Sequence, residues 1–204
     1  MIFASLACFS QKQTVAYSRD YEFKEGLFLT INDFINNTPI KKDLIVTGLS
    51  KYDLDFLHQV TEQKYIAYKD TAGIEQKIET ATLWGYCQNR SIYLNYNKTF
   101  NRLNVVGTLC HFTSRITSFV GYQDPMNANY GINTNYDELR QFVLDTQTDN
   151  VWAFTVATME LLLKNDELLY TEFMKLKKRK KIDSIFVYLR KYNEKHPLYL
   201  NENQ

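Results

Sequence analysis

The chain has 204 residues, of which 45% are hydrophobic and 23% charged, and its formal net charge is +1. A chain of this length buries about 70% of the surface that it exposes when unfolded, so it can fold without disulfides or metals. The composition excludes an intrinsically disordered chain, and the 7 glycines and 3 prolines exclude collagen-like and proline-rich classes. The near-zero net charge gives no general argument for a nucleic-acid or anionic-membrane partner. Aromatic residues reach 15%, which favours a sheet-rich, tightly packed fold or an adhesive surface.

Residues 1–10 resemble the end of a secretory signal peptide. An apolar run over 2–9 is followed by polar chain, with a candidate cleavage site after Ser10. The run lacks a basic region before it and is too short to span a membrane, so we expect a truncated signal remnant and no transmembrane span. A lipid anchor at Cys8 is disfavoured because Ser5 stands where lipoprotein sites usually carry Leu. We therefore predict export to the periplasm or cell envelope; the alternative, a short apolar N-terminal strand, would leave the protein in the cytoplasm.

The first predicted elements are short. Gly26 to Ile31 alternates as a strand, and Thr30 stands three residues before Asp33 in a variant of the capping box. A helix of one or two turns should therefore start there and end before Pro39. Residues 43–49 form the next predicted strand.

Residues 64–113 predict an antiparallel meander. The expected strands cover residues 64–69, 74–79, 82–87, 92–96, 100–106 and 108–113. Ile92, Leu94 and Tyr96 share one strand face, and Tyr93 and Asn95 share the other. Turn residues recur at short, regular intervals, which is typical of sheets that curl into small barrels or rolls.

A long loop is predicted after the meander. Residues 117–137 lose all periodicity and collect Gly, Pro and Asn, and such long loops are either disordered or functional. A hairpin then joins residues 142–144 to 151–154.

The chain ends in predicted helices over about 155–195. Thr155 can cap the first helix, and Asn165–Asp166 interrupt the helical pattern. An apolar stripe marks the last helix at Ile182, Ile185, Phe186, Leu189 and Tyr192. We therefore predict one α+β domain over residues 11–204: an antiparallel β-meander forming a curled sheet or small barrel, with the C-terminal helices packed on it.

Basic residues gather near the C-terminus, in the block 175–181. Lys178 and Lys180 in this block are candidate ligands for an anionic partner such as lipid head groups, lipopolysaccharide or nucleic acid. The preferred alternative is a solvated junction at a helix C-terminus, where cations complement the helix dipole. The block lacks interleaved aromatics and any helix-turn-helix signature, which disfavours nucleic acid.

No linear motif indicates catalysis. The histidines His58, His111 and His196 are too far apart for metalloprotease spacing, and no GxSxG, P-loop or GxGxxG occurs. Cys110 and His111 are adjacent on a predicted strand, so their side chains point to opposite faces and cannot form a nucleophile–base pair. The sequence thus predicts no catalytic residue, no metal site and no cofactor.

Two weaker signals concern aromatic and cysteine pairs. Trp84 and Tyr86 are candidates for an exposed stripe that stacks on sugar rings or peptides; the preferred alternative is that both faces of their strand are covered. If Cys8 is removed with the signal peptide, Cys87 and Cys110 are the two cysteines that remain. They are a candidate disulfide, or else two small buried residues on neighbouring strands.

Four segments carry a resemblance: Gly26–Pro39, Trp84–Cys87, Ile92–Tyr96 and Leu189–Tyr199. In them the chain resembles a group of uncharacterised exported proteins of Bacteroidetes-type bacteria. The resemblance implies export, without an assigned activity or site residues.

We therefore expect a non-catalytic binding or assembly module of the cell envelope, whose partner is an envelope protein or polymer. The alternative is a hydrolase that acts on an envelope or dietary polymer, with residues 117–137 as a lid.

Overall fold

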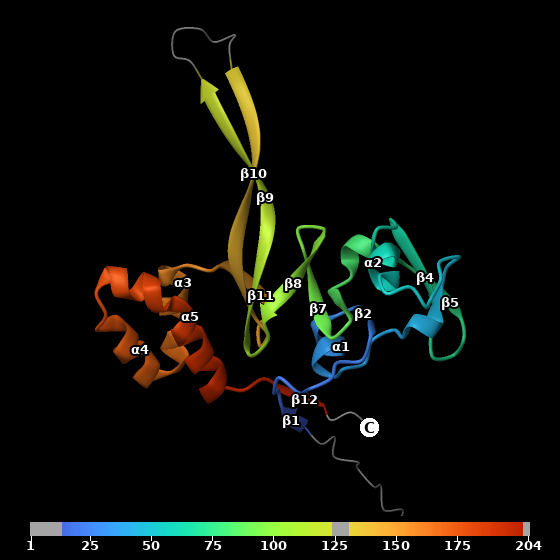
Figure 1. The fold of residues 1–204 in the computed structure, drawn as a ribbon, viewed down its shortest axis with the longest axis horizontal. Helices are drawn as coiled ribbons and strands as arrows, with labels where there is room; N and C mark the ends of the chain where they lie inside the picture. Colours follow the sequence, from blue (N-terminus) through green and yellow to red (C-terminus); the bar gives the residue numbers. More distant parts are fainter. Residues whose placement is uncertain (1–13, 124–130, 202–204) are drawn as a thin grey trace, which may run out of the picture.

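The structure is a computed structural model that describes residues 14–123 and 131–201. Three antiparallel sheets and a group of C-terminal helices give an α+β fold, as predicted (Figure 1). The predicted signal remnant, its cleavage after Ser10 and the lipid anchor at Cys8 lie outside the described residues.

The largest sheet has seven strands in the order β11-β10-β9-β8-β7-β6-β2. Their bounds are β2 Gly26–Phe28, β6 Gly85–Gln88, β7 Ser91–Tyr96, β8 Thr99–Val105, β9 Leu109–Gln123, β10 Gly131–Asp145 and β11 Asn150–Ala153. All neighbours pair antiparallel, so the meander is confirmed. Within the described chain the sheet is open, with β11 and β2 at its edges, and it does not close into a barrel.

The turns of the meander follow from positive φ angles at paired residues. Asn89 and Arg90 have φ 50° and 59°, and Asn97 and Lys98 have φ 53° and 62°. Two successive left-handed residues match the twist of the flanking strands, which favours tight two-residue hairpins.

A smaller unit precedes β6. It contains the sheet β3 (Ile45–Val46), β4 (Tyr65–Lys69) and β5 (Glu75–Glu79), with helix α2 (Phe56–Thr61). The predicted strand over 43–49 is reduced to two residues, because Lys42–Leu44 form a 3-10 helix.

Helix α1 (Ile31–Ile35) has the predicted cap. The Thr30 side chain accepts a hydrogen bond from the Asp33 amide at 3.2 Å, and the Asp33 carboxylate accepts one from the Thr30 amide at 2.8 Å. This early start shortens the strand predicted over 26–31 to Gly26–Phe28.

The C-terminal helices are α3 (Val156–Leu162), α4 (Glu167–Met174) and α5 (Lys178–Lys195). Thr155 and Asp166 cap α3 and α4 through their side chains. The stripe predicted on α5 is confirmed except at Ile182, which is 56% exposed, while Tyr188 is buried instead. The helices bury their apolar faces against one another and against Leu109 and Val143 of the sheet.

The loop predicted over 117–137 is wrong at both of its ends, and its middle, 124–130, lies outside the described residues. Residues 117–123 and 131–137 are the distal parts of β9 and β10, paired from Thr117↔Asp137 to Gln123↔Gly131. They extend beyond the neighbouring strands as a two-stranded ribbon (Figure 1). Strand alternation arises when one face of a sheet is buried and the other is wet. A ribbon outside the sheet is under no such constraint, so its sequence lacks the pattern.

The two ends of the described chain pair with each other, which the sequence did not indicate. β1 (Thr14–Ala16) lies antiparallel to β12 (Tyr199–Asn201). The pairing places the segment 17–23 beside the C-terminal end of α5, and this segment forms one wall of the site described next.

Candidate functional site

The two aromatic candidates from the sequence are core residues. Trp84 is 8% exposed, stacks on Phe34 at 4.7 Å between ring centroids, and donates from Nε1 to Asp149 Oδ1 at 3.1 Å. Tyr86 is 2% exposed and stacks on Tyr93 at 4.7 Å. Neither side chain forms an exposed stripe, so the covered-face alternative is confirmed.

The candidate disulfide is not formed. Cys87 and Cys110 are free, buried thiols on β6 and β9. Two strands separate β6 from β9, so their strands are not neighbours; three strand spacings correspond to about 14 Å, whereas a disulfide needs Cα atoms within about 7 Å. Burial raises the pKa of both thiols to about 12, which keeps them protonated and poorly nucleophilic at neutral pH.

The basic block spans the junction between α4 and α5: Lys175 is the C-cap residue of α4, as the preferred alternative expected, but the rest of the block lies at the N-terminal end of α5. Lys178 and Lys180 are exposed in the first turn of α5, where the helix dipole disfavours cations. Lys181 is buried at 8% exposure, and its Nζ donates to Glu160 Oε1 at 2.6 Å. The block is therefore part solvated surface and part buried ion pair, and the structure brings no further group to Lys178 or Lys180.

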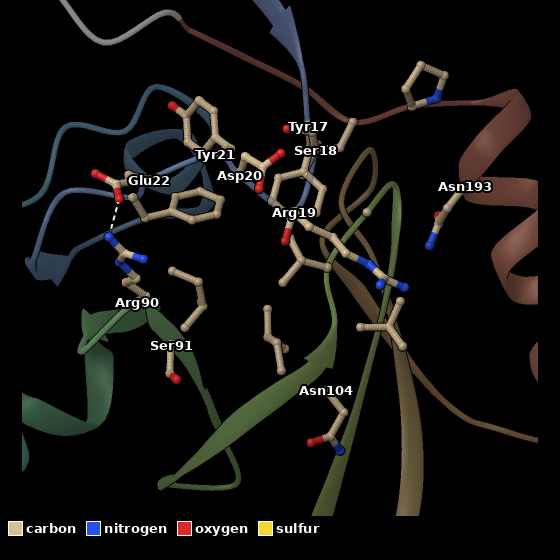
Figure 2. A pocket seen from close by; sticks show the side chains of 18 of the residues that line it. Tyr17, Ser18, Arg19, Asp20, Tyr21, Glu22, Arg90, Ser91, Asn104 and Asn193 are labelled. Carbon is tan, nitrogen blue, oxygen red and sulfur yellow. Dashed lines mark hydrogen bonds and ion pairs between the residues drawn. The ribbon is translucent and has the colours of Figure 1, made fainter.

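A pocket of about 770 Å³ lies where three parts of the chain meet. Its walls are the segment 17–23, strands β7 and β8 with the turn after β8, and the C-terminal part of α5 with residues 197–198. Figure 2 shows Tyr17 to Glu22 on one side, Ser91 and Asn104 on the strands, and Asn193 on the helix opposite. None of these residues was a site candidate from the sequence.

Hydrogen bonds hold the segment 17–23 in place. The Tyr17 amide donates to Leu198 O at 2.7 Å, which continues the β1–β12 pairing. The Tyr21 hydroxyl donates to Asn201 O at 2.9 Å and accepts from Asn37 Nδ2 at 3.0 Å. The first wall of the pocket is therefore fixed to the C-terminal strand and to the end of α1.

The helix wall is held by Asn193. Its Oδ1 accepts from the Leu109 amide and its Nδ2 donates to the Leu109 carbonyl, both at 2.8 Å. Gly107 makes this approach possible, because a Cβ there would lie 2.5 Å from the Asn193 side chain. Asn193 thus fastens α5 to the start of β9.

Aromatic and aliphatic side chains form the apolar part of the pocket lining. Tyr17, Tyr21 and Phe23 contact one another with ring centroids 4.9 to 6.3 Å apart. Ile92 and Leu103 are buried in the same core cluster. Burial raises the pKa of Tyr17 and of Tyr21, so both phenols are protonated hydrogen-bonding groups at neutral pH.

Charged side chains of both signs line the pocket mouth. Arg90 forms an ion pair with Glu22 (dashed in Figure 2), and Arg19 is adjacent to Asp20 in the same wall. Arg190 and Glu194 of α5 also line the pocket, as does Arg102 on the exposed face of β8. The lining therefore mixes four arginines with three carboxylates, a small excess of positive charge.

Two other titratable clusters are structural. His111 is 4% exposed, with Nε2 3.0 Å from Gln141 Oε1 and its ring against the edges of Phe154 and Phe186, which also contact each other. Burial lowers its pKa, so it stays neutral at pH 7. No catalytic role follows from a ring enclosed in this way.

Asp166 joins the ends of two helices. It accepts from the Leu169 amide at 3.0 Å as the cap of α4, and from Lys195 and His196 at the end of α5 at 2.8 and 2.9 Å. The hydrogen bond from the Leu169 amide is the main cause that holds the pKa of Asp166 well below its usual value, and the hydrogen bond from Lys195 is the second. The nearby Thr108 hydroxyl donates to the backbone carbonyl of His196, so it is not part of a nucleophile relay.

No family model, no curated protein and no solved structure matches this chain. The fold and the pocket therefore define the protein only as an α+β chain with a pocket of mixed charge between the segment 17–23, the sheet and the helix α5. Among residues 14–123 and 131–201, no helix has the length and apolar character needed to cross a membrane.

Proposed function

We propose that the protein is a non-catalytic binding module and that the pocket between residues 17–23, β8 and α5 is its ligand site. The observation that carries the proposal is the pocket itself, which has a volume of about 770 Å³ and is lined by both polar and apolar side chains. Ligand sites typically have volumes of 300–1,000 Å³ and combine apolar walls with placed polar groups.

Titratable groups of the pocket and of the core have pKa values shifted so that they stay in their unreactive protonation states at neutral pH. Raised pKa values keep Tyr17, Tyr21 and the Cys110 thiol protonated, and the lowered pKa of His111 belongs to a ring covered by two phenylalanines. Catalytic acids and bases usually show the opposite tuning, towards the working pH. The hydrolase alternative also loses its lid, because residues 117–123 and 131–137 form strands and do not line the pocket.

A fragment screen by protein NMR tests the site. Small ring compounds with hydrogen-bonding groups should bind and shift the amide signals of residues 17–23 and 103–107. Asn104→Trp should fill the pocket from β8 and weaken that binding about tenfold or more, whereas Asn101→Trp, on the same strand but outside the pocket, should not. Equal binding to both variants, or shifts that map elsewhere, would refute the proposed site. Turnover of any bound ester, peptide or glycoside would refute the non-catalytic part.

We also propose that the protein is exported to the cell envelope. The support is the apolar run over residues 2–9 and the resemblance to exported proteins. Mass spectrometry of the protein expressed in its own host from an upstream start should find the chain cut after Ser10, with Cys8 removed. A mature protein that retains Met1 would contradict export.

A further inference from the structure

We infer that the pocket binds a neutral saccharide, with Tyr17 as the ring that stacks on a sugar. This inference rests on the proposed binding function and adds the chemical class of the ligand. It is carried by three features of the pocket: a fixed aromatic platform, a rim of unused hydrogen-bonding side chains, and a lining that mixes both signs of charge.

The aromatic platform is continuous with the core. Tyr21 contacts Phe23 at 4.9 Å, Phe23 stacks on Phe34 at 5.1 Å, and Phe34 stacks on Trp84 at 4.7 Å. Tyr17 contacts both Tyr21 and Phe23, at 6.3 and 6.0 Å. A ring held in this way loses little conformational freedom when a ligand binds, which favours affinity.

Tyr17 differs from Tyr21 in what its hydroxyl does. The Tyr21 hydroxyl is occupied by Asn201 and Asn37. The Tyr17 hydroxyl has no hydrogen bond to any described residue, although the ring is half-buried and lines the pocket. Tyr17 therefore offers an apolar face and a polar tip to a ligand, and sugars present both C–H faces and hydroxyls.

The rim supplies partners for hydroxyl groups. The side chains of Ser18, Arg19, Asp20 and Ser91 line the pocket and make no hydrogen bond to another described side chain or backbone group. Together they provide hydroxyl, guanidinium and carboxylate groups, which can both donate to and accept from a polyol. Asn104 adds an amide whose one bond, to Thr113, is long at 3.4 Å.

The mixed charge of the lining matches neither a strongly anionic nor a strongly cationic ligand. An anion beside the lining arginines would share the pocket with Asp20, Glu22 and Glu194, and a cation beside these carboxylates would share it with the arginines. Like charges brought together in a partly desolvated site are unfavourable. A neutral polyol makes charge-assisted hydrogen bonds with both signs and brings no charge of its own. The volume of about 770 Å³ leaves room for a short oligosaccharide rather than a single small ion.

Isothermal titration with defined trisaccharides tests this. The neutral probes are cellotriose, maltotriose, xylotriose, mannotriose and chitotriose; the comparison ligands are trigalacturonate and an N-acetylated, C-amidated tripeptide. At least one neutral trisaccharide should bind with millimolar or tighter affinity and bind better than both comparison ligands. The inference is overturned if none binds, or if the anionic sugar or the peptide binds tighter.

Variants assign the binding to Tyr17. Tyr17→Ala should weaken the best saccharide about tenfold, and Tyr17→Phe only a few-fold because the ring remains. Tyr52→Ala is the matched control, since Tyr52 is 98% exposed and lies outside the pocket. If Tyr17→Ala does not fold, Asp20→Asn at the exposed rim replaces it and should also weaken binding. Unchanged affinity in the pocket variants would refute the role of Tyr17 and the rim.

The outcomes separate this inference from the proposed function. If fragments bind in the pocket but no neutral saccharide does, the proposed binding function stands and the saccharide inference is refuted. If neither fragments nor saccharides shift the signals of residues 17–23, both proposals are refuted.

Discussion

The contact between Asn193 and Leu109 sets how firmly α5 is attached to the sheet. Both hydrogen bonds are 2.8 Å long, and Leu109 is 1% exposed, so its amide and carbonyl lose their partners without reaching water when Asn193 is truncated. At about 1–1.5 kcal/mol for each bond, Asn193→Ala should lower the free energy of unfolding by about 2–3 kcal/mol. For a chain of this size that corresponds to a fall in Tm of about 5–10 °C.

Gly107 makes this prediction sharper, because it depends on the same side chain. The three atoms nearest to a Cβ at position 107 all belong to Asn193, the closest at 2.5 Å. Gly107→Ala should therefore displace Asn193, break the same two bonds and cost a similar amount. In the Asn193→Ala background the obstruction is gone, and Gly107→Ala should be close to neutral.

A double-mutant cycle by urea denaturation measures the difference. We expect a coupling energy of about 2 kcal/mol between the two positions, well above the deviations of about 0.3–0.5 kcal/mol found for independent sites. If the two single effects simply add, the obstruction at Gly107 involves other atoms and the reasoning is refuted.

Three further predictions follow from burial, titration and register. Because folding lowers the pKa of His111, its contribution to stability is complete above the unfolded pKa of about 6.5 and declines as the pH falls below that value. His111→Phe should therefore reduce the fall of the urea unfolding midpoint between pH 7 and pH 5, and an unchanged fall would contradict this. Cys87 and Cys110 should resist a thiol reagent in the native protein at neutral pH and react fully in denaturant, without prior reduction; rapid native labelling would disprove their burial. Residues 118–136 can be replaced by Asn-Gly, which joins the paired residues Thr117 and Asp137 in a two-residue turn. This shortened chain should keep its Tm within a few degrees, because the described core side chains end at Ile116 and resume at Phe142. Loss of the folded state would show that the distal ribbon supports the core.

Local rules predicted the local structure well. The Thr30–Asp33 cap, the Thr155 cap and the break at Asp166 all depend on residues within four positions of one another, and all are present. The meander from β6 to β11 was predictable for the same reason, since each of these strands pairs with the next one along the chain; the pairing of β2 with β6 and the separate sheet of β3, β4 and β5 were not predicted. These features are set by nearest neighbours in sequence.

Features that depend on distant residues were missed. Gln88 caps α2 by accepting from the Leu57 and His58 amides at 2.8 and 3.1 Å, while the local N-cap residue Asp55 makes no such bond. Lys181 looked like one more surface cation, yet Glu160 draws it into the helical unit. No pattern within a short window of sequence carries such pairings.

The proposed binding site also depends on residues that are distant in the sequence. Its wall over residues 17–23 exists only because β1 pairs with β12, almost the whole length of the described chain away. A local signal was present, since Tyr17, Tyr21 and Phe23 lie among Arg19, Asp20 and Glu22. Beside an apparent signal remnant, however, that mixture of rings and charges does not distinguish a pocket wall from a solvated N-terminal segment.

The high aromatic content therefore has two roles that the structure separates by position. Trp84, Phe34 and Phe23 form a stack inside the core, and Tyr21 and Tyr17 extend the cluster to the pocket. The buried rings orient the outer ones, so the same side chains that stabilise the fold also fix the platform offered to a ligand. A site built in this way gains rigidity from the core, and this makes a flat, ring-shaped, hydroxyl-bearing ligand the best complement to the open face of Tyr17.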